Sequence, residues 1–332
     1  MKTEVCITVD VEYSIGGAFG WPDRFKPLGN EVVECMVDGR EQGLGFILDS
    51  LNRYGMTGTF FTEALQTTYF GDEPMGRTAQ RIVAAGQDLQ LHLHPCWLHF
   101  RDDRWKQAGF QPNDYCSGRT DAELDEMIGL GIDTFARWGV SRPSALRTGG
   151  FHTDSAVFRA MARAGMPLAS NISLGIFEPK EKDLQVTGGR HLFEGVLEVP
   201  ALSYRSPYLI RTGASPLRSL AITATSKTET EALLWQARHT GVQTVVVLTH
   251  PHEFVRRKSF RFDDLRAHHT NQARLLNLLD FVQKNGEDFS AVSFAERKNA
   301  WLAAGTVAAP GLQTQRVHAW MRAAENAISD YT

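Results

Sequence analysis

Short runs rich in apolar and β-branched residues alternate along the chain with longer amphipathic runs. This alternation constrains the fold, because it predicts a parallel sheet whose strands are connected by crossover helices. Several apolar runs are almost uninterrupted, as expected for parallel strands that are covered on both faces. The predicted strands span residues 4–10, 57–62, 88–94, 144–147, 167–170, 195–199, 244–249 and 289–293.

Three helices are predicted between these strands. Residues 43–53 and 271–284 carry apolar side chains at intervals of three and four, which places them on one helical face. The second of these runs stops at Asn285-Gly286, a typical helix end. The third predicted helix spans residues 120–138, because Thr120 and Glu123 form a capping box at its start.

The composition gives no domain boundary before about residue 303. Residues 1–304 are therefore predicted to form one domain, and residues 305–332 a C-terminal tail with a helix near residues 317–328. Hydrophobic residues make up 42% of the 332 residues, which is sufficient for a core that can hold a buried site.

Charge and targeting signals exclude several classes of function. The formal net charge of −3 gives no basic field for nucleic acid or an anionic membrane, and the short run at 256–258 (Arg-Arg-Lys) is predicted to be a solvated loop. No apolar run reaches membrane-spanning length, and no signal-peptide core precedes the first strand, so a cytoplasmic location is expected. The four cysteines form no CxxC pair and are expected to be reduced thiols; the oligomeric state is left open.

Three long irregular segments follow predicted strands, at residues 13–40, 95–119 and 202–217. In α/β barrels, the loops at the carboxyl ends of the strands build the active site. The first two segments are rich in aromatic residues, which suit stacking on sugar rings or packing of the loops. These residues are Phe19, Trp21, Phe25, Trp97, Phe100, Trp105, Phe110 and Tyr115.

The first predicted strand ends in two carboxylates, Asp10 and Glu12. Their spacing of two points both side chains to the same face of a strand. Two carboxylates together at the end of a buried strand are costly unless a cation or a proton offsets their charge. The pair by itself is also compatible with exposed strand-end acids.

Histidines occupy equivalent positions at the ends of two other predicted strands. His92 and His94 are two residues apart and are followed by Pro95, and imidazoles placed in this way can bind one divalent ion. Cys96 lies four residues after His92, so the identity of the second ligand stays open at this point.

The strand at residues 244–249 ends in His250-Pro251-His252, and a histidine here can protonate a leaving amine. The strand at residues 144–147 ends in Arg147 before two glycines, where the guanidinium can orient a carboxylate through bidentate hydrogen bonds. An exposed arginine in a helix-capping turn explains Arg147 equally well by itself.

Taken in order, these motifs resemble those of the polysaccharide deacetylase superfamily, also known as the NodB-homology fold or carbohydrate esterase family four. Asp10-Val11-Glu12 is similar to a variant of the first motif, and residues 54–62 (YGMTGTFFT) resemble the second strand. Residues 86–92 look like the strand that enters the metal-histidine motif, and residues 138–150 resemble the motif that carries the arginine. Residues 197–200 resemble a later strand, residues 248–250 the catalytic-histidine motif, and residues 289–296 the final strand and helix, so the resemblance covers about residues 4–304.

The resemblance implies a distorted (β/α)7-type barrel of parallel strands and a hydrolase that removes an acetyl group from an N-acetylated sugar or polysaccharide precursor. By position, Asp10 would be the base that activates water, Arg147 would tether Asp10, and His250 would be the acid for the departing amine. Glu12 and His92 would bind the metal.

Two positions depart from the family pattern. The family has a second histidine four residues after the first, where this chain has Cys96, so His94 is the predicted substitute and Cys96 the alternative. Glu12 stands where aspartate is usual. Zn²⁺ is the expected cofactor, because it accepts imidazole, carboxylate and thiolate ligands alike.

Two other functions remain open from the sequence. One is hydrolysis of a cyclic amide or ureide such as allantoin on the same fold. The other is a catalytically silent carbohydrate-binding relative, which the cysteine at position 96 favours and the retained set of acids and histidines disfavours.

Overall fold

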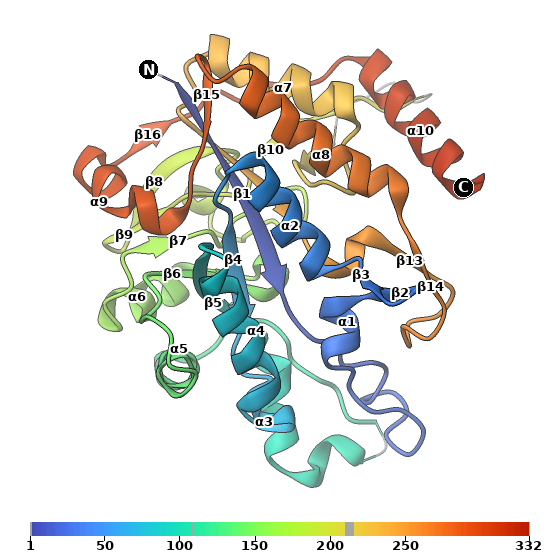
Figure 1. Ribbon diagram of the computed structural model, residues 1–332. Helices are drawn as coiled ribbons and strands as arrows, with labels where there is room; N and C mark the ends of the chain where they lie inside the picture. The colour runs from blue at the N-terminus through green and yellow to red at the C-terminus, as the bar shows by residue number, and fades with distance from the viewer. Residues whose placement is uncertain (1, 108, 210–215, 332) are drawn as a thin grey trace.

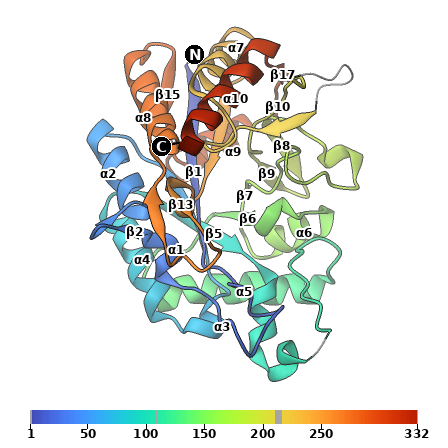
Figure 2. The same ribbon diagram turned by 90° about the vertical axis from the view of Figure 1, so that its right-hand side faces the viewer.

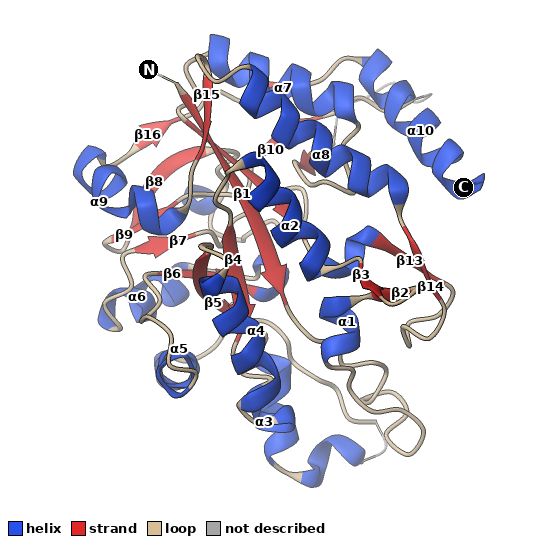
Figure 3. Cartoon of the chain, in the orientation of Figure 1, coloured by secondary structure: helices blue, strands red, loops and turns tan. Residues whose placement is uncertain are grey.

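The computed structural model describes residues 2–107, 109–209 and 216–331. Strands occupy the centre of the molecule and helices surround them (Figures 1 and 3). The predicted alternation is therefore present, and each predicted strand has a counterpart. The central parallel strands are β1 (Thr3–Val11), β4 (Thr59–Glu63), β5 (Asp88–Leu93), β6 (Ala145–Thr148), β7 (Leu168–Ala169), β9 (Val196–Glu198) and β12 (Thr244–Thr249).

These strands form a curled sheet in the order β12-β1-β4-β5-β6-β7-β9, and all neighbours along it are parallel. The antiparallel strands β8 (Gly189–Phe193) and β16 (Val307–Ala308) extend it, while β15 (Phe289–Ala291) pairs with the first part of β1. Beyond β9, Ala201 makes a parallel bridge to Val246 of β12, which brings the two ends of the curl together. The architecture is the predicted distorted (β/α)7-type barrel.

Side chains of β1 alternate between two apolar layers. Val5, Ile7 and Val9 belong to the large core between the strands and the helices, whereas Cys6 belongs to a smaller cluster with Phe61 of β4. That smaller cluster fills the inside of the barrel. Because side chains on a strand alternate, Thr8 and Asp10 continue the inward row that Cys6 begins.

Helices cover the outside of the barrel (Figure 2). The predicted helices are present as α2 (Leu44–Tyr54), α5 (Asp121–Arg137) and α8 (His269–Lys284), and Thr120 forms the predicted capping box with Glu123. Three further long helices were not predicted: α4 (Glu73–Ala84), α6 (Ser155–Arg163) and α7 (Lys227–His239). Helix α9 (Phe294–Ala304) follows β15, where the resemblance of residues 289–296 implies a final strand and helix.

Residues 305–327 pack onto the barrel. After β16, strand β17 (Leu312–Gln313) pairs with β10 (Ser203–Arg205), and α10 (Arg316–Tyr331) contains the predicted tail helix. Arg322 of α10 lies 2.5 Å from the buried carboxylate of Glu229 on α7. The division of the chain into residues 1–304 and a separate tail stays a prediction.

No helix in the described ranges is both long and apolar enough to cross a membrane. The shorter elements include helices α1 (Asn30–Glu34) and α3 (Thr67–Phe70). They also include the small strands β2 (Met36–Val37) and β3 (Arg40–Glu41), β11 (Leu217–Ser219), β13 (Val255–Arg257) and β14 (Leu265–Ala267). Short 3₁₀ turns span Pro95–Arg101, Asp103–Lys106, Gly149–Phe151, Lys182–Leu184 and Pro251–Phe254.

A buried carboxylate ties α9 to the amino-terminal end of the sheet. Asp88 at the start of β5 accepts hydrogen bonds from Thr59 Oγ1 at 2.9 Å, Gln90 Nε2 at 2.7 Å and the backbone N–H of Ala295 at 3.0 Å. In α/β barrels this end serves stability rather than catalysis. Asp88 is therefore a structural carboxylate.

Replacing Asp88 with alanine is expected to lower the free energy of unfolding by about 2–4 kcal/mol, because three buried donors lose their acceptor. Urea denaturation measures this change. The exposed Asp49 on α2 provides the control, since Asp49→Ala should change stability by no more than about 0.5 kcal/mol. Equal losses in the two variants would show that Asp88 does not hold this end together.

Candidate active site

The carboxyl end of β1 supplies both predicted carboxylates, which differ in burial and in the side chains they face. Asp10 is almost completely buried and faces Arg147 and His250. Glu12 lies just beyond the last residue of β1, is partly exposed, and faces His92 and His94. The six predicted site residues therefore lie at one end of the barrel.

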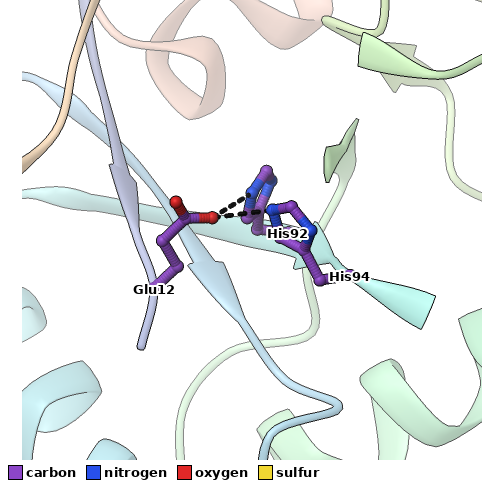
Figure 4. Close-up of side chains that lie close together, drawn as sticks. All are labelled: Glu12, His92 and His94. Atoms are coloured by element: carbon purple, nitrogen blue, oxygen red, sulfur yellow. Dashed lines mark hydrogen bonds and ion pairs between the residues drawn. The ribbon is translucent and has the colours of Figure 1, made fainter. Parts of the chain in front are cut away.

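Glu12, His92 and His94 form a compact group (Figure 4). The Oε2 atom of Glu12 lies 3.2 Å from Nε2 of His92 and 2.7 Å from Nε2 of His94. One ligand atom from each residue lies within 4.8 Å of the others. His92 belongs to β5 and His94 follows that strand, so two elements distant in sequence build the group.

The second nitrogen of each imidazole has its own acceptor. Nδ1 of His92 lies 2.9 Å from the backbone carbonyl of Arg147, and Nδ1 of His94 lies 2.6 Å from Oδ2 of Asp114. Because a carbonyl or carboxylate oxygen only accepts, each Nδ1 carries the hydrogen. In a neutral imidazole, each Nε2 then carries a lone pair that points at the Glu12 carboxylate. A cation or additional protons must therefore lie between the two Nε2 atoms and this carboxylate.

Electrostatics at this group favour a positive charge. Burial acts to lower the pKa of His94, but the carboxylates of Glu12 and Asp114 outweigh it and raise the pKa well above its usual range. Burial acts to raise the pKa of Glu12, but the two histidines hold it well below its usual range. This donor set of two imidazoles and one carboxylate fits a divalent metal ion such as Zn²⁺.

Cys96 lies in a second, overlapping group with His94 and Asp114, whose ligand atoms are also within 4.8 Å of one another. Its backbone N–H donates to Oδ1 of Asp114 at 3.0 Å, and burial raises the pKa of its thiol well above the usual range. His94 points toward Glu12 rather than away from it. The geometry thus favours His94 over Cys96 as the partner of His92.

Arg147 connects Asp10 to the rest of the barrel. Its NH1 donates to Oδ1 of Asp10 at 2.7 Å and to Thr8 Oγ1 at 3.0 Å, and its NH2 donates to Ser170 Oγ at 2.8 Å. The guanidinium is fully buried and lies over the ring of Phe61, 4.2 Å from its centroid. Asp10 is therefore held in a single orientation.

His250 follows β12 and lies across from Asp10, with 3.8 Å between Nε2 and Asp10 Oδ2. Its Nδ1 lies 3.0 Å from Oε1 of Glu253. The other oxygen of this carboxylate, Oε2, accepts a hydrogen bond from Thr249 Oγ1 at 2.7 Å. Burial lowers the pKa of His250, but Glu253, Asp10 and Glu12 outweigh it and raise the pKa to about 9. The imidazole is thus protonated near neutral pH, with Nε2 directed into the site.

Three carboxylates that contact the candidate site were missed from the sequence. Asp114 orients His94, Glu253 orients His250, and the buried Glu63 accepts from the backbone N–H groups of Leu65 at 2.9 Å and of His94 at 3.1 Å. Burial raises the pKa of Glu63 to about 8. Only Glu253 had a local signal, because an acid three residues after His250 can fold back onto it in a turn.

An open cavity of about 290 Å³ leads to this group. Glu12, His94, Cys96 and Asp114 line its floor, and His252, Arg257 and Phe262 line another part of it. Burial lowers the pKa of His252 to about 4, so this imidazole is neutral at neutral pH. The cavity has the size of a small-molecule site.

Most aromatic residues of the two long loops pack on one another rather than on the cavity. Phe19 stacks on Phe100 with 4.9 Å between ring centroids and also contacts Trp105 and Phe110. Trp21 and Tyr115 are exposed, and their rings contact Phe25 and His152 respectively. Loop packing therefore accounts for most of this aromatic set.

No family model matches this sequence, and no curated protein is similar enough to match it. Solved structures do match. A crystal structure from Mycobacterium smegmatis, described as a polysaccharide deacetylase, is similar with a TM-score of 0.55 and 15% identity, over 95% of each chain.

Two further matches are a family 4 carbohydrate esterase from Streptomyces lividans in complex with acetate and a CE4 family pseudoenzyme from Bacillus anthracis. The first has a TM-score of 0.44 at 12% identity and covers 93% of this chain and 98% of that chain. The second has a TM-score of 0.45 at 12% identity and covers 95% of this chain and 70% of that chain.

The match to the Mycobacterium smegmatis structure extends over nearly the whole of both chains, and at 15% identity it establishes the fold. The order of the strand-end motifs along the sequence predicts the same fold. The chain therefore has the same fold as this Mycobacterium smegmatis structure.

Proposed function

We propose that this protein is a hydrolase that removes the acetyl group from the amide nitrogen of an N-acetylated sugar. The observation that carries the proposal is that two neighbouring carboxylates face different partners. Glu12 faces two imidazoles, while Asp10 faces a guanidinium and a third imidazole. Metal-assisted amide hydrolysis uses a cation site together with an acid and a base, and these residues offer both.

Glu12, His92 and His94 would hold the divalent ion, for which Zn²⁺ is the proposed identity. When bound, such an ion polarises the acetyl carbonyl and makes a nearby water molecule more acidic. Arg147 and Asp114 support the group, because they fix the orientation of both imidazoles through Nδ1.

Asp10 is the proposed base. Arg147 occupies its Oδ1, so Oδ2 is the atom directed toward His250 and is placed to accept a proton from the attacking water. As the water oxygen bonds to the acetyl carbon, the carbon–nitrogen bond breaks. Acetate and a free amine are the products.

His250 is the proposed acid. It carries a proton on Nε2 and donates it to the departing nitrogen as the carbon–nitrogen bond breaks. Glu253 holds the imidazole through Nδ1, so the proton to be donated faces the site. The proposed acid and base thus face each other, with 3.8 Å between His250 Nε2 and Asp10 Oδ2.

Substrate assays decide between this proposal and the alternatives. Metal-loaded protein is incubated separately with N-acetylated sugars and with cyclic ureides, and acetate release and ring opening are measured. Acetate release from a sugar supports the proposal. Ring opening without acetate release would indicate the ureide hydrolase, and no turnover of either class would indicate a silent relative.

Replacing His250 with alanine is expected to lower kcat at least about 100-fold, because the leaving amine loses its proton donor. Metal content and Tm should stay close to those of the unmodified protein, since His250 is not a ligand. All three quantities are measured on one preparation. Full kcat, or loss of the metal, would show that this role is wrong.

Bound metal should depend on Glu12, His92 and His94, and not on Cys96. Glu12→Ala and His94→Ala are expected to reduce bound metal well below one equivalent, while Cys96→Ser keeps it, because His94 and not Cys96 faces Glu12. Elemental analysis of protein purified without chelator measures this, with His92→Ala as a further loss. Metal lost from Cys96→Ser but kept in His94→Ala would reverse the ligand assignment.

The pH dependence of kcat should show a basic limb that belongs to His250. An acid must be protonated, so kcat is retained below the raised pKa of about 9 and falls as the pH rises through it. Glu253→Gln removes the carboxylate that raises this pKa most, and is expected to move the limb about one unit or more to lower pH. Glu287→Gln, at an exposed position, is the control. If the basic limb of the kcat profile does not shift in Glu253→Gln, that limb does not report the titration of His250.

A further inference from the structure

His252 lines the active-site cavity, but the proposed mechanism does not use it. It belongs to the 3₁₀ turn Pro251–Phe254 and lies two residues after the proposed acid, His250. The two imidazole rings are neighbours, with 5.1 Å between their centroids and 35° between their planes. A ligand whose amide nitrogen faces His250 therefore has His252 beside it.

The turn that carries His252 is fixed by hydrogen bonds and packing. The carboxylate of Glu253 accepts from the backbone N–H of His250 at 3.1 Å, and Nδ2 of Asn271 donates to the backbone carbonyl of Glu253 at 2.7 Å. The ring of Phe262 lies nearly perpendicular to that of His252, with 6.3 Å between centroids. The position of this imidazole is therefore set before a ligand binds.

The hydrogen bonding of His252 differs from that of the other imidazoles at the site. Nδ1 of His92, His94 and His250 each faces an oxygen acceptor, which fixes a hydrogen on that nitrogen. Nδ1 of His252 is buried and has no hydrogen-bond partner in the part of the chain that the structure describes. Because the ring lines the cavity, the other nitrogen, Nε2, is the one that a ligand can reach.

The imidazole of His252 is uncharged at neutral pH. Burial and the neighbouring positive charge of His250 lower its pKa to about 4, although Glu253 acts in the opposite direction. A neutral imidazole has one N–H donor and one lone-pair acceptor, and here no partner of Nδ1 selects between the two tautomers. Nε2 can therefore donate or accept a hydrogen bond.

A hydroxyl group matches such a nitrogen. It donates through its O–H and accepts through its lone pairs, so it can pair with either tautomer of the ring. A carboxylate only accepts and an ammonium group only donates, and neither forms an ion pair with an uncharged imidazole. Sugar rings carry several hydroxyl groups, so the free nitrogen of His252 suits a sugar in this cavity.

We propose that His252 is a specificity-determining residue, whose Nε2 forms a hydrogen bond with a hydroxyl group on the sugar ring that carries the acetamido group. This inference rests on the proposed deacetylase function and narrows its substrates to N-acetylated sugars in which that hydroxyl group is free. A site built to bond a hydroxyl group discriminates against analogues that lack it, because its own polar group is then left without a partner.

The first test measures binding without catalysis, in metal-loaded protein that carries Asp10→Asn to remove the proposed base. The methyl glycoside of N-acetylglucosamine and its 3-, 4- and 6-deoxy analogues are titrated calorimetrically, with and without His252→Phe. The dissociation constant of the parent sugar is expected to rise at least about fivefold in His252→Phe. For the analogue that lacks the bonded hydroxyl group, the two proteins should agree within about twofold, since the lost partner is already absent.

Two further variants serve as controls. His239→Phe makes the same substitution at an exposed histidine of α7, which stacks on Trp235, and should leave every sugar affinity unchanged. His252→Gln retains a donor and an acceptor and should keep part of the discrimination between parent and deoxy sugars.

Stability and metal content show whether His252→Phe is a fair test. Its Tm is expected to equal or exceed that of the unmodified protein, because an apolar ring replaces a buried nitrogen that has no partner. Bound metal should be retained, since His252 is not a proposed ligand. Loss of metal, or an equal loss of affinity for the parent sugar and all three analogues, would overturn the inference.

The second test separates this inference from the proposed function. It measures kcat/KM for acetate release from the same four sugars, with Asp10 restored. Discrimination in binding that depends on His252, without acetate release from any sugar, would retain the inference and refute the deacetylase. Acetate release at equal kcat/KM from all four sugars, unaffected by His252→Phe, would retain the deacetylase and refute the role of His252. Absence of binding by every sugar would also overturn that role.

Discussion

The arrangement of the site depends on one buried guanidinium. Arg147 has no exposed surface, and an unpaired charge in such a position would cost several kcal/mol. Its nitrogens donate to Asp10, Thr8 and Ser170, and its backbone carbonyl accepts from His92. One residue of β6 thereby fixes a carboxylate from β1 and an imidazole from β5. The proposed base and the proposed metal ligands are positioned by the same strand end.

Two neighbouring carboxylates acquire different chemistry because of what surrounds them. Asp10 points along the inward row of β1 and meets only a cation and a protonated imidazole. Glu12 lies one step further out, where its longer side chain reaches both His92 and His94. The extra methylene of Glu12, relative to an aspartate, is thus accommodated by the position of His94. Separate partners keep the two negative charges from competing for one site.

Charge is distributed unevenly over the mouth of the barrel. The inner residues are a balanced set of carboxylates, imidazoles and one guanidinium, while the hairpin formed by β13 and β14 carries more arginine and lysine than acid. The expectation that residues 256–258 form a solvated loop is wrong, because Arg256 and Arg257 belong to β13, where Val255 packs with Val32 and Cys35. Apolar packing thus holds in place a strand whose charged residues alone predict a loop.

The sequence by itself determined the parallel sheet and the residues at the ends of its strands, and the family resemblance of its motifs implied the barrel. Uninterrupted apolar runs predict parallel strands, and parallel strands bring their carboxyl ends together, so Asp10, His92, Arg147 and His250 could be grouped without a structure. Only the tertiary structure decided which other side chains contact and orient these residues. Asp114 lies in an irregular loop without periodicity, and the cross-strand pairing of β13 with β14 has no local signal at residues 256–258. The physical reason is that strand formation follows from local side-chain pattern, whereas hydrogen bonds and charge contacts between loops depend on distances that only the folded chain sets.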